Sequence, residues 1–347
     1  MTPRLSSSGT PGIEQSFGAN YGLMTSTSTS TEDGEARWRW TPDDATGGTP
    51  VAWAAGSDGV VLAATDIGLL ATRDGGCTYA FVDANLEDVA ITSMISADNG
   101  RLWLTSETPS GGDVWASDDG GVSWRALGVG GEDVLMARVE RDAKGVIWAS
   151  GFDRARRARL VWRVSEESDG VEVTEVADDA ILVGPGIIAR ADARWTIEVL
   201  DEAKRVDLPE GAPVTAIMRE GALYVHLEDD TLVVWSEDES GWRTLPGKTR
   251  CLIEGNDGAL WRCQRTVDGD AHFSRKAPES TVWEEVYPFA SISPADCPEG
   301  TPGHALIASQ WGILQNIGVG PRPEPAGEKM DAHAGCCAQN GMPRGIP

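Results

Sequence analysis

The chain has 347 residues, with 54 acidic and 29 basic side chains and a formal net charge of −25 at pH 7. A chain of this charge repels phosphate backbones, which argues against a nucleic-acid partner. No segment approaches the ~20 apolar residues of a membrane span, so we expect none. Short apolar runs, glycine-rich turns and 14 tryptophans, without the i, i+3, i+4 recurrence of amphipathic helices, predict an all-β protein.

The chain begins with a segment rich in Ser, Thr and Gly, residues 1–34, that we expect to be disordered or extended. It lacks the apolar core of a secretory signal, so no signal peptide is present in the chain as given. The next residues, 36–42, alternate arginine with tryptophan and are typical of an outer β-strand.

Two octapeptides, residues 72–79 and 117–124, share the pattern S/T-x-D-x-G-x-S/T-aromatic. In such a turn the carboxylate accepts hydrogen bonds from its own backbone, and the glycine adopts a positive φ. The final aromatic ring packs against the sheet. We therefore interpret the motif residues as structural, and not as catalytic or metal-binding groups. They are Thr72, Asp74, Gly76, Thr78 and Tyr79 in the first turn, and Ser117, Asp119, Gly121, Ser123 and Trp124 in the second.

This pattern is the Asp-box, and the chain resembles the Asp-box (BNR-repeat) β-propellers. Strand-like units 37 to 45 residues apart match the length of a four-stranded blade. We expect residues 35–318 to form a single propeller of seven four-stranded blades, with six or eight as alternatives. The units begin near Val51, Val89, Val134, Val176, Val214, Cys251 and Phe289.

The end of the chain is expected to close the propeller. Residues 305–308 are predicted to be a strand of the last blade, which the N-terminal strand at 36–42 would complete, so that no sheet edge stays open. The tail, residues 319–347, is rich in Pro and Gly and is expected to be disordered. The sequence does not assign a role to its adjacent cysteines, Cys336 and Cys337.

Four other cysteines are candidates for disulfide bonds. A hairpin centred on residues 256–258 places Cys251 opposite Cys263. Cys77 and Cys297 fall in turns that share one face of a propeller, so they approach each other if the last blade adjoins the first. The alternative is buried or free thiols in a reducing cytosol. Two bridges favour an oxidising compartment, periplasmic or extracellular, and a secreted protein.

Two further clusters are candidate binding sites. The basic run contains Arg154, Arg156, Arg157 and Arg159, whose guanidinium groups could grip a carboxylate or phosphate bidentately. Its alternative is a solvated loop paired with nearby acids.

The second cluster consists of Asp268, Asp270 and His272, whose oxygen ligands would suit a hard cation, although Asp-Gly at 268–269 is also an ordinary hairpin turn. We expect no cofactor.

The resemblance implies a non-catalytic binding or scaffold propeller for a protein or peptide, like the photosystem II stability/assembly factor-like and sortilin-type propellers. The alternative is a glycan-active enzyme, sialidase-like or another glycosidase or lyase, with a glycan as ligand. Sialidases use an arginine triad, a Tyr nucleophile and an early R-I-P motif, which the first strands here lack. The 4 histidines allow no nucleophile–base pair to be assigned. A structural surface protein is the third alternative.

Overall fold

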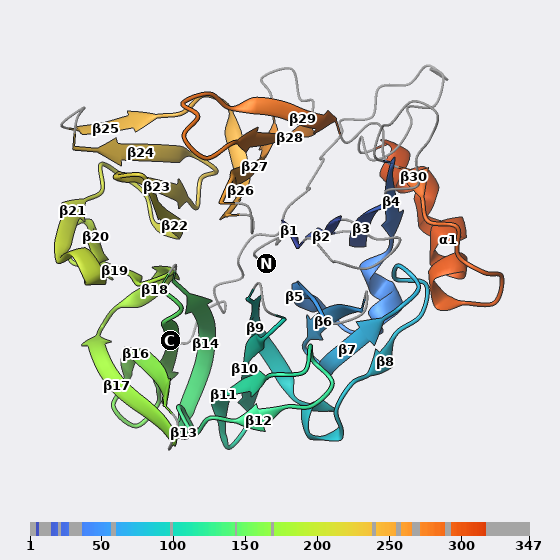
Figure 1. Ribbon diagram of the computed structural model, residues 1–347, viewed down its shortest axis with the longest axis horizontal. Helices are drawn as coiled ribbons and strands as arrows, with labels where there is room; N and C mark the ends of the chain where they lie inside the picture. Colours follow the sequence, from blue (N-terminus) through green and yellow to red (C-terminus); the bar gives the residue numbers. More distant parts are fainter. Residues whose placement is uncertain are drawn as a thin grey trace. The chain divides into compact units, whose positions relative to one another are not determined.

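The computed structural model describes residues 5–6, 15–19, 22–27, 37–56, 60–97, 100–142, 144–167, 170–237, 241–254, 258–265, 271–288 and 293–316 (Figure 1). The chain divides into two compact units. Unit 1 comprises Met1–Thr65, Leu70–Val82 and Gly247–Pro347, and unit 2 comprises Asp66–Leu69 and Asp83–Pro246.

Unit 2 repeats one plan, in which four consecutive strands pair antiparallel with their neighbours in sequence. The short strand β13 (Gly131–Glu132) adds to β11, and the 3-10 helices η3 (Ala84–Leu86) and η4 (Leu200–Glu202) lie outside the strands. In chain order the sheets are β9 (Ala90–Ser96), β10 (Leu102–Thr108), β11 (Gly111–Ser117) and β12 (Arg125–Ala126); β14 (Val134–Arg141), β15 (Ile147–Asp153), β16 (Ala158–Glu167) and β17 (Gly170–Asp178); β18 (Ile181–Gly184), β19 (Ile187–Ala191), β20 (Trp195–Val199) and β21 (Lys204–Asp207); and β22 (Pro213–Arg219), β23 (Ala222–Leu227), β24 (Leu232–Ser236) and β25 (Gly241–Thr244).

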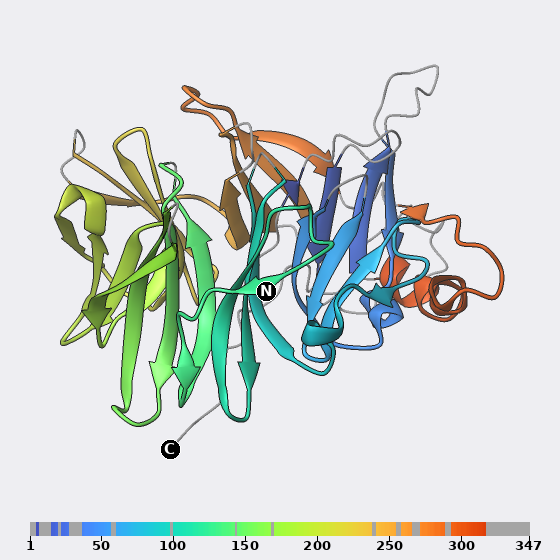
Figure 2. The ribbon, with the colours of Figure 1, turned by 60° about the horizontal axis from the view of Figure 1, so that its bottom comes forward.

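The core of unit 2 lies between the faces of successive sheets. The second strands β10, β15 and β23 are buried over runs of consecutive residues, as expected of strands that are covered on both faces. Val114, Val139 and Ile147 belong to one apolar cluster that joins the sheets β9–β13 and β14–β17. Figure 2 shows the long strands of the β14–β17 sheet side by side. Burial of these faces stabilises the stack of sheets in unit 2.

Unit 1 contains two four-stranded sheets of the same plan and one five-stranded sheet with a different strand order. The first two are β5 (Pro50–Ala55), β6 (Val61–Thr65), β7 (Gly68–Thr72) and β8 (Ala80–Phe81), and β26 (Lys248–Glu254), β27 (Leu260–Arg265), β28 (Ala271–Lys276) and β29 (Glu284–Pro288). The third has the order β1 (Leu5–Ser6), β2 (Gln15–Ala19), β3 (Gly22–Thr27), β4 (Arg37–Thr41) and β30 (Ser293–Pro294), with β30 parallel to β4.

The predicted number of blades and their closure are wrong. Six four-stranded blades run from β5 to β29 in the described part of the chain, not seven. The strand at 36–42 is present as β4, but it pairs with β3 and β30 instead of completing a C-terminal blade. The reason is that residues 5–27, which composition alone marks as polar and extended, supply strands of their own.

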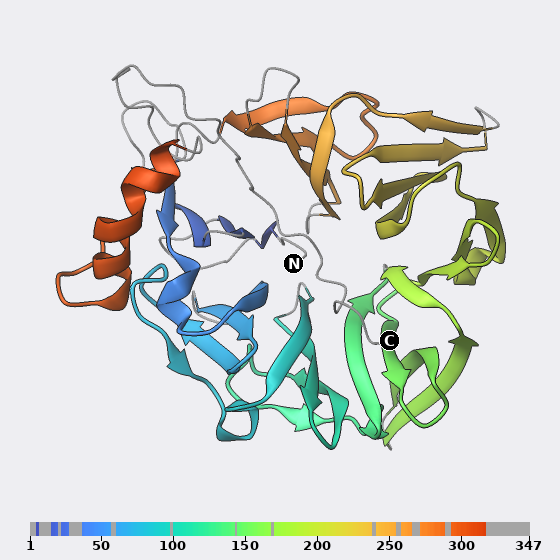
Figure 3. The same ribbon diagram turned by 180° about the vertical axis from the view of Figure 1, so that it is seen from behind.

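The strand predicted at residues 305–308 is also wrong, because these residues lie in the helix α1 (Pro302–Asn316). The helix carries no Asp, Glu, Lys or Arg, and a short apolar run without charges does not distinguish a buried strand from a helix. The helix lies beside β4 and the 3-10 helix η1 (Asp43–Thr46) in Figures 1 and 3. Among the described helices, none is long and apolar enough to cross a membrane.

The predicted starts of the other blades agree with the structure, with one exception. Val51 and Val134 lie in β5 and β14, and Val214 and Cys251 lie in β22 and β26. Val176, however, lies in β17, the fourth strand of the preceding blade. The fourth blade begins instead at Ile181, because β17 is unusually long and carries its apolar alternation up to the next blade. Phe289 lies outside the described residues.

Candidate functional site

The two octapeptide turns are held by matching sets of hydrogen bonds around one carboxylate each. In the second turn, Asp119 Oδ1 accepts bonds from Ser117 Oγ at 2.8 Å and from the Ser123 N–H at 2.9 Å. Its Oδ2 accepts the Ser123 hydroxyl at 2.6 Å. Asp74 accepts the equivalent bonds from Thr72 and Thr78 at 2.8, 3.0 and 2.6 Å. These carboxylates are fully engaged in their own turns.

The glycines and aromatic residues of the turns also contribute to the shape of the turns. Gly76 and Gly121 have φ values of 96° and 92°, a region that strains any other residue. Trp124 is buried, and its indole N–H donates to the Gly121 carbonyl at 3.1 Å. Tyr79 is half-buried and packs near Trp53, with ring centroids 6.3 Å apart. Each turn is therefore a closed structural element.

The hydrogen bonds of the turns lower the carboxyl pKa values. Bonds from the Ser123 hydroxyl and then from its backbone N–H lower the pKa of Asp119 to about 2. For Asp74, burial raises the pKa, but the bonds from Thr78 and Thr72 outweigh it and the net shift is downward. Both groups are therefore ionised at neutral pH and are unsuited to act as general acids.

Asp119→Asn is expected to lower the free energy of unfolding by about 1 kcal/mol at pH 7, a figure discounted because the carboxylate is exposed to solvent. Because the folded-state pKa is depressed, this stabilisation is present above the unfolded pKa near 3.8 and is lost as pH falls towards 2. Denaturant unfolding of wild type and variant between pH 2 and 7 measures the difference. Glu132→Gln, an exposed carboxylate of β13, serves as the control and should show no such pH dependence; a difference that persists unchanged at pH 2 would contradict the assignment.

Both predicted disulfide bonds are present. Cys251 and Cys263 are directly opposite each other in β26 and β27, with Cα atoms 4.9 Å apart. Cys77 and Cys297 are bonded with Cα atoms 5.4 Å apart. Cys297 reaches Cys77 from the segment between β30 and α1, and not from a turn of a last blade. The N–H of Gly303 at the start of α1 donates to the Cys77 carbonyl at 3.0 Å, so the bridge fixes the helix to the first octapeptide turn.

The basic run lies in the turn between β15 and β16 and at the start of β16, and two of its arginines are paired locally. Arg156 donates to both carboxylate oxygens of Glu175, at 2.7 and 3.0 Å, and this hydrogen bonding, followed by the charge of Glu175, raises the pKa of Arg156. Arg154 donates to the Pro109 carbonyl at 3.1 Å and lies 3.9 Å from the carboxylate of Asp133. These contacts favour the alternative of a loop paired with nearby acids.

The remaining arginines, Arg157 and Arg159, are exposed, and within the described residues neither has an ion pair. Of the predicted cation ligands, Asp268 and Asp270 lie outside the described residues, and His272 lies in β28 without a described side chain. No group of three or more potential metal ligands occurs among the residues that the structure describes. Cys336 and Cys337 lie outside them.

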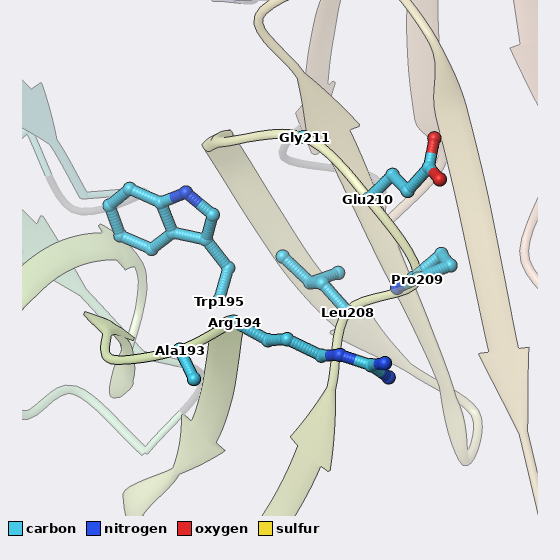
Figure 4. Close-up of a pocket in the computed structure, with 7 residues that line it drawn as sticks. All are labelled: Ala193, Arg194, Trp195, Leu208, Pro209, Glu210 and Gly211. Atoms are coloured by element: carbon cyan, nitrogen blue, oxygen red, sulfur yellow. The ribbon is translucent and has the colours of Figure 1, made fainter.

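A hollow that the sequence did not reveal lies at one end of the β18–β21 sheet. It has a volume of about 410 Å³ and is formed by the turn between β19 and β20 together with the connection from β21 to β22 (Figure 4). The two segments are joined by a bond from the Leu208 N–H to the Trp195 carbonyl at 2.8 Å. The lining residues are Ala193, Arg194, Trp195, Leu208, Pro209, Glu210 and Gly211.

The hollow combines an apolar base with an aromatic ring and two charges. Leu208 is buried, while Trp195 is half-buried and packs partly against the core of the sheet. Arg194 and Glu210 are exposed, and neither has an ion pair within the described part of the chain. In Figure 4 the Arg194 side chain extends along Leu208 and Pro209, away from the indole of Trp195. The hollow therefore presents the ring and the two charges at separate points.

Gly211 is required by the shape of this connection. Its φ of 85° is in the left-handed region, and a Cβ there would lie 3.2 Å from the Leu227 side chain. The residues 208–211, Leu-Pro-Glu-Gly, form an ordinary turn sequence. The sequence identifies the turn. It does not show that Trp195, 13 residues before Leu208, lies next to this turn, because no local periodicity connects the two segments.

Comparison with known proteins gives no family for this chain. No protein-family model matches it, and no curated protein matches it. Among solved structures, an extracellular domain from B. thetaiotaomicron is 12% identical to this chain, with a TM-score of 0.46. The match covers 81% of this chain and 41% of the chain of that domain. A GH74 enzyme from Niastella koreensis is 13% identical, with a TM-score of 0.45. The match covers 77% of this chain and 41% of the enzyme's chain.

A third structure, a nidogen/laminin complex, is 15% identical with a TM-score of 0.41 and covers 66% of this chain and 92% of its own. The chain thus spans about two fifths of the length of the first two structures, at 41% each. Likenesses at these values carry no argument about substrate or partner. The class rests on the chain's own topology: successive four-stranded antiparallel blades define an all-β protein of the β-propeller fold.

Proposed function

We propose that this chain is a non-catalytic Asp-box propeller that binds a protein or peptide at the hollow lined by Trp195. The observation that supports this is the grouping of a half-buried tryptophan and two unpaired charges over a buried leucine. Tryptophan and arginine are the residues that most often dominate binding energy at protein interfaces. The matching bond sets of the two octapeptide turns support membership of the Asp-box group.

The glycan-active alternative receives less support from the described residues. The hollow contains a single carboxylate, Glu210, and neither His nor Tyr, so its lining offers no acid–base pair for glycoside hydrolysis. Tyr79 is unsuited to act as a nucleophile, because its hydroxyl oxygen is buried and burial raises its pKa above the ordinary range.

Asp43 is the described carboxyl group whose environment most resembles that of a catalytic acid. Burial, and then the charge of Asp44, raise the pKa of Asp43 to about 6. Asp43 begins the 3-10 helix η1, and its backbone carbonyl accepts the Thr46 hydroxyl at 2.8 Å. A raised pKa without a partner acid or base at a hollow does not define a reaction centre.

A periplasmic or extracellular location is part of the same proposal. It is supported by the two disulfide bonds, since such bonds persist in oxidising compartments and are rare in reducing ones. The net charge of −25 makes a nucleic-acid partner an unfavourable alternative.

Trp195→Ala is expected to weaken binding of selected peptides roughly ten-fold or more, because truncating a central aromatic contact costs about 2 kcal/mol or more. The measurement is selection of a phage-displayed random peptide library on the full chain, followed by titration of the enriched peptides against wild type and variant. Val122→Ala is the matched control: Val122 is 59% exposed, and it lies in the second octapeptide turn, at the opposite ends of the strands. Enriched peptides that bind Trp195→Ala as tightly as wild type would place the binding site elsewhere.

A further inference from the structure

The connections that form the hollow belong to an acidic edge of unit 2. In a four-strand meander, the turn from second to third strand and the link to the next sheet lie at the same end of the strands. We call this end of the unit 2 sheets the linker edge. Among its described residues, acids outnumber the arginines of residues 154–157 and Arg194. The acids are Glu132, Asp133, Asp153, Asp178, Asp179, Asp192, Glu210, Glu228, Asp229 and Asp230.

Two of these carboxylates lie beside the hollow without an ion pair in the described residues. Glu210 lines it directly. Glu228, in the turn between β23 and β24, is held against the same connection by a bond from its N–H to the Ala212 carbonyl at 3.0 Å. Both side chains are exposed. Together with the net charge of −25, they create a field that attracts cations and steers them to this end of the sheet.

Elsewhere in the same unit, the protein shows how it holds a cation with this combination of groups. The ammonium group of Lys204 lies 4.1 Å from the ring centroid of Trp235 and 3.1 Å from the carboxylate of Glu237. A tryptophan face and a glutamate thus share one positive charge. No described cation of the chain lies over Trp195, and the arginine of the hollow, Arg194, extends away from the ring (Figure 4).

We propose that the hollow receives a basic side chain, an arginine or lysine, from an extended peptide segment of a partner protein. This inference rests on the proposed function and names the ligand class of the same site. The cationic head lies over the Trp195 indole, its aliphatic stem contacts Leu208, and the charge of Glu210 attracts it from the other side of the hollow. Arg194, on the other side of Pro209, repels a second cation and pairs with a carboxylate of the peptide, which sets the direction of the chain.

The test follows the indole N–H signal of Trp195 in NMR spectra of the full chain, with the signal assigned by its loss in Trp195→Phe. The probes are a capped Gly-Gly-Arg-Gly-Gly peptide, its lysine version and its citrulline version, which keeps the shape of arginine without the charge. The arginine and lysine peptides are expected to shift the signal, and citrulline is expected to weaken binding roughly five- to twenty-fold. Added salt should weaken the charged peptides alone.

Glu210→Gln is expected to weaken the arginine peptide roughly two- to five-fold, whereas Glu210→Asp, which keeps the charge, should retain binding. The matched control is Glu202→Gln, an exposed acid of η4 at the other end of the same sheet, which should leave binding unchanged. Equal binding of citrulline, or no effect of Glu210→Gln, would overturn the inference. If library-selected peptides without a basic side chain shift Trp195, the proposed function stands and this inference fails; if no peptide of either kind shifts it, both fail.

Discussion

Replacing both Cys77 and Cys297 with alanine is expected to lower the free energy of unfolding by about 5 kcal/mol. The two residues are 220 positions apart in sequence, so the bond removes a very long loop from the unfolded chain. It also holds the start of α1 against the first octapeptide turn through Gly303. The measurement is denaturant unfolding of wild type and double variant under non-reducing conditions, after alkylation has shown that Cys77, Cys297, Cys251 and Cys263 are blocked in the wild type.

The second bridge supplies the matched comparison for this result. Cys251 and Cys263 are 12 positions apart, and the same chain-entropy relation gives about 3 kcal/mol for their removal. Removing the Cys77–Cys297 bond, which closes the longer loop, should therefore lower the free energy of unfolding more than removing the Cys251–Cys263 bond. A larger loss on removing Cys251 and Cys263 would contradict the ranking. Free alkylation of Cys77, Cys297, Cys251 and Cys263 in the wild-type chain would contradict the oxidising compartment that we propose.

Gly184→Ala is expected to destabilise the protein by about 3 kcal/mol. Gly184 ends β18, and an added Cβ would overlap the carbonyl of Ala216 in β22, a buried residue of the next sheet. Backbone cannot yield as a flexible side chain can, so the two sheets must separate or the strand must shift. Thermal or denaturant unfolding measures the loss.

Gly241→Ala is the control for that substitution. Gly241 begins β25, and a Cβ there meets nothing within 4 Å. Alanine at this position should be neutral or slightly stabilising, because it reduces the freedom of the unfolded chain. Similar destabilisation by both substitutions would mean that the close packing of β18 against β22 is not the cause.

Local patterns were sufficient to predict much of the blade structure. The octapeptides fix the turn before the fourth strand, since Asp74 and Asp119 satisfy their bonds within eight residues. Hairpin symmetry predicts the pairing of Cys251 with Cys263. These features depend on residues near one another in sequence, which is why they can be recognised without the structure.

The errors arose where the outcome depends on tertiary context. Residues 302–316 contain no Asp, Glu, Lys or Arg and show no clear apolar periodicity. Their helical conformation therefore depends on the surrounding residues of unit 1. The sequence places Val176 at the start of the next blade, because the apolar alternation continues through β17 without a break. The hollow joins Trp195 to the connection at 208–211, and only the pairing of β20 with β21 brings them together. Neither the segment around Trp195 nor residues 208–211 carries a sequence pattern that predicts their contact.

Binding at the Trp195 hollow is tested most directly by titrating the library-selected peptides against wild type, Trp195→Ala and Val122→Ala in parallel. The account predicts that affinity falls roughly ten-fold or more for Trp195→Ala and is unchanged for Val122→Ala. Equal affinity for all three proteins, or loss only in Val122→Ala, would contradict it and move the site away from the linker edge.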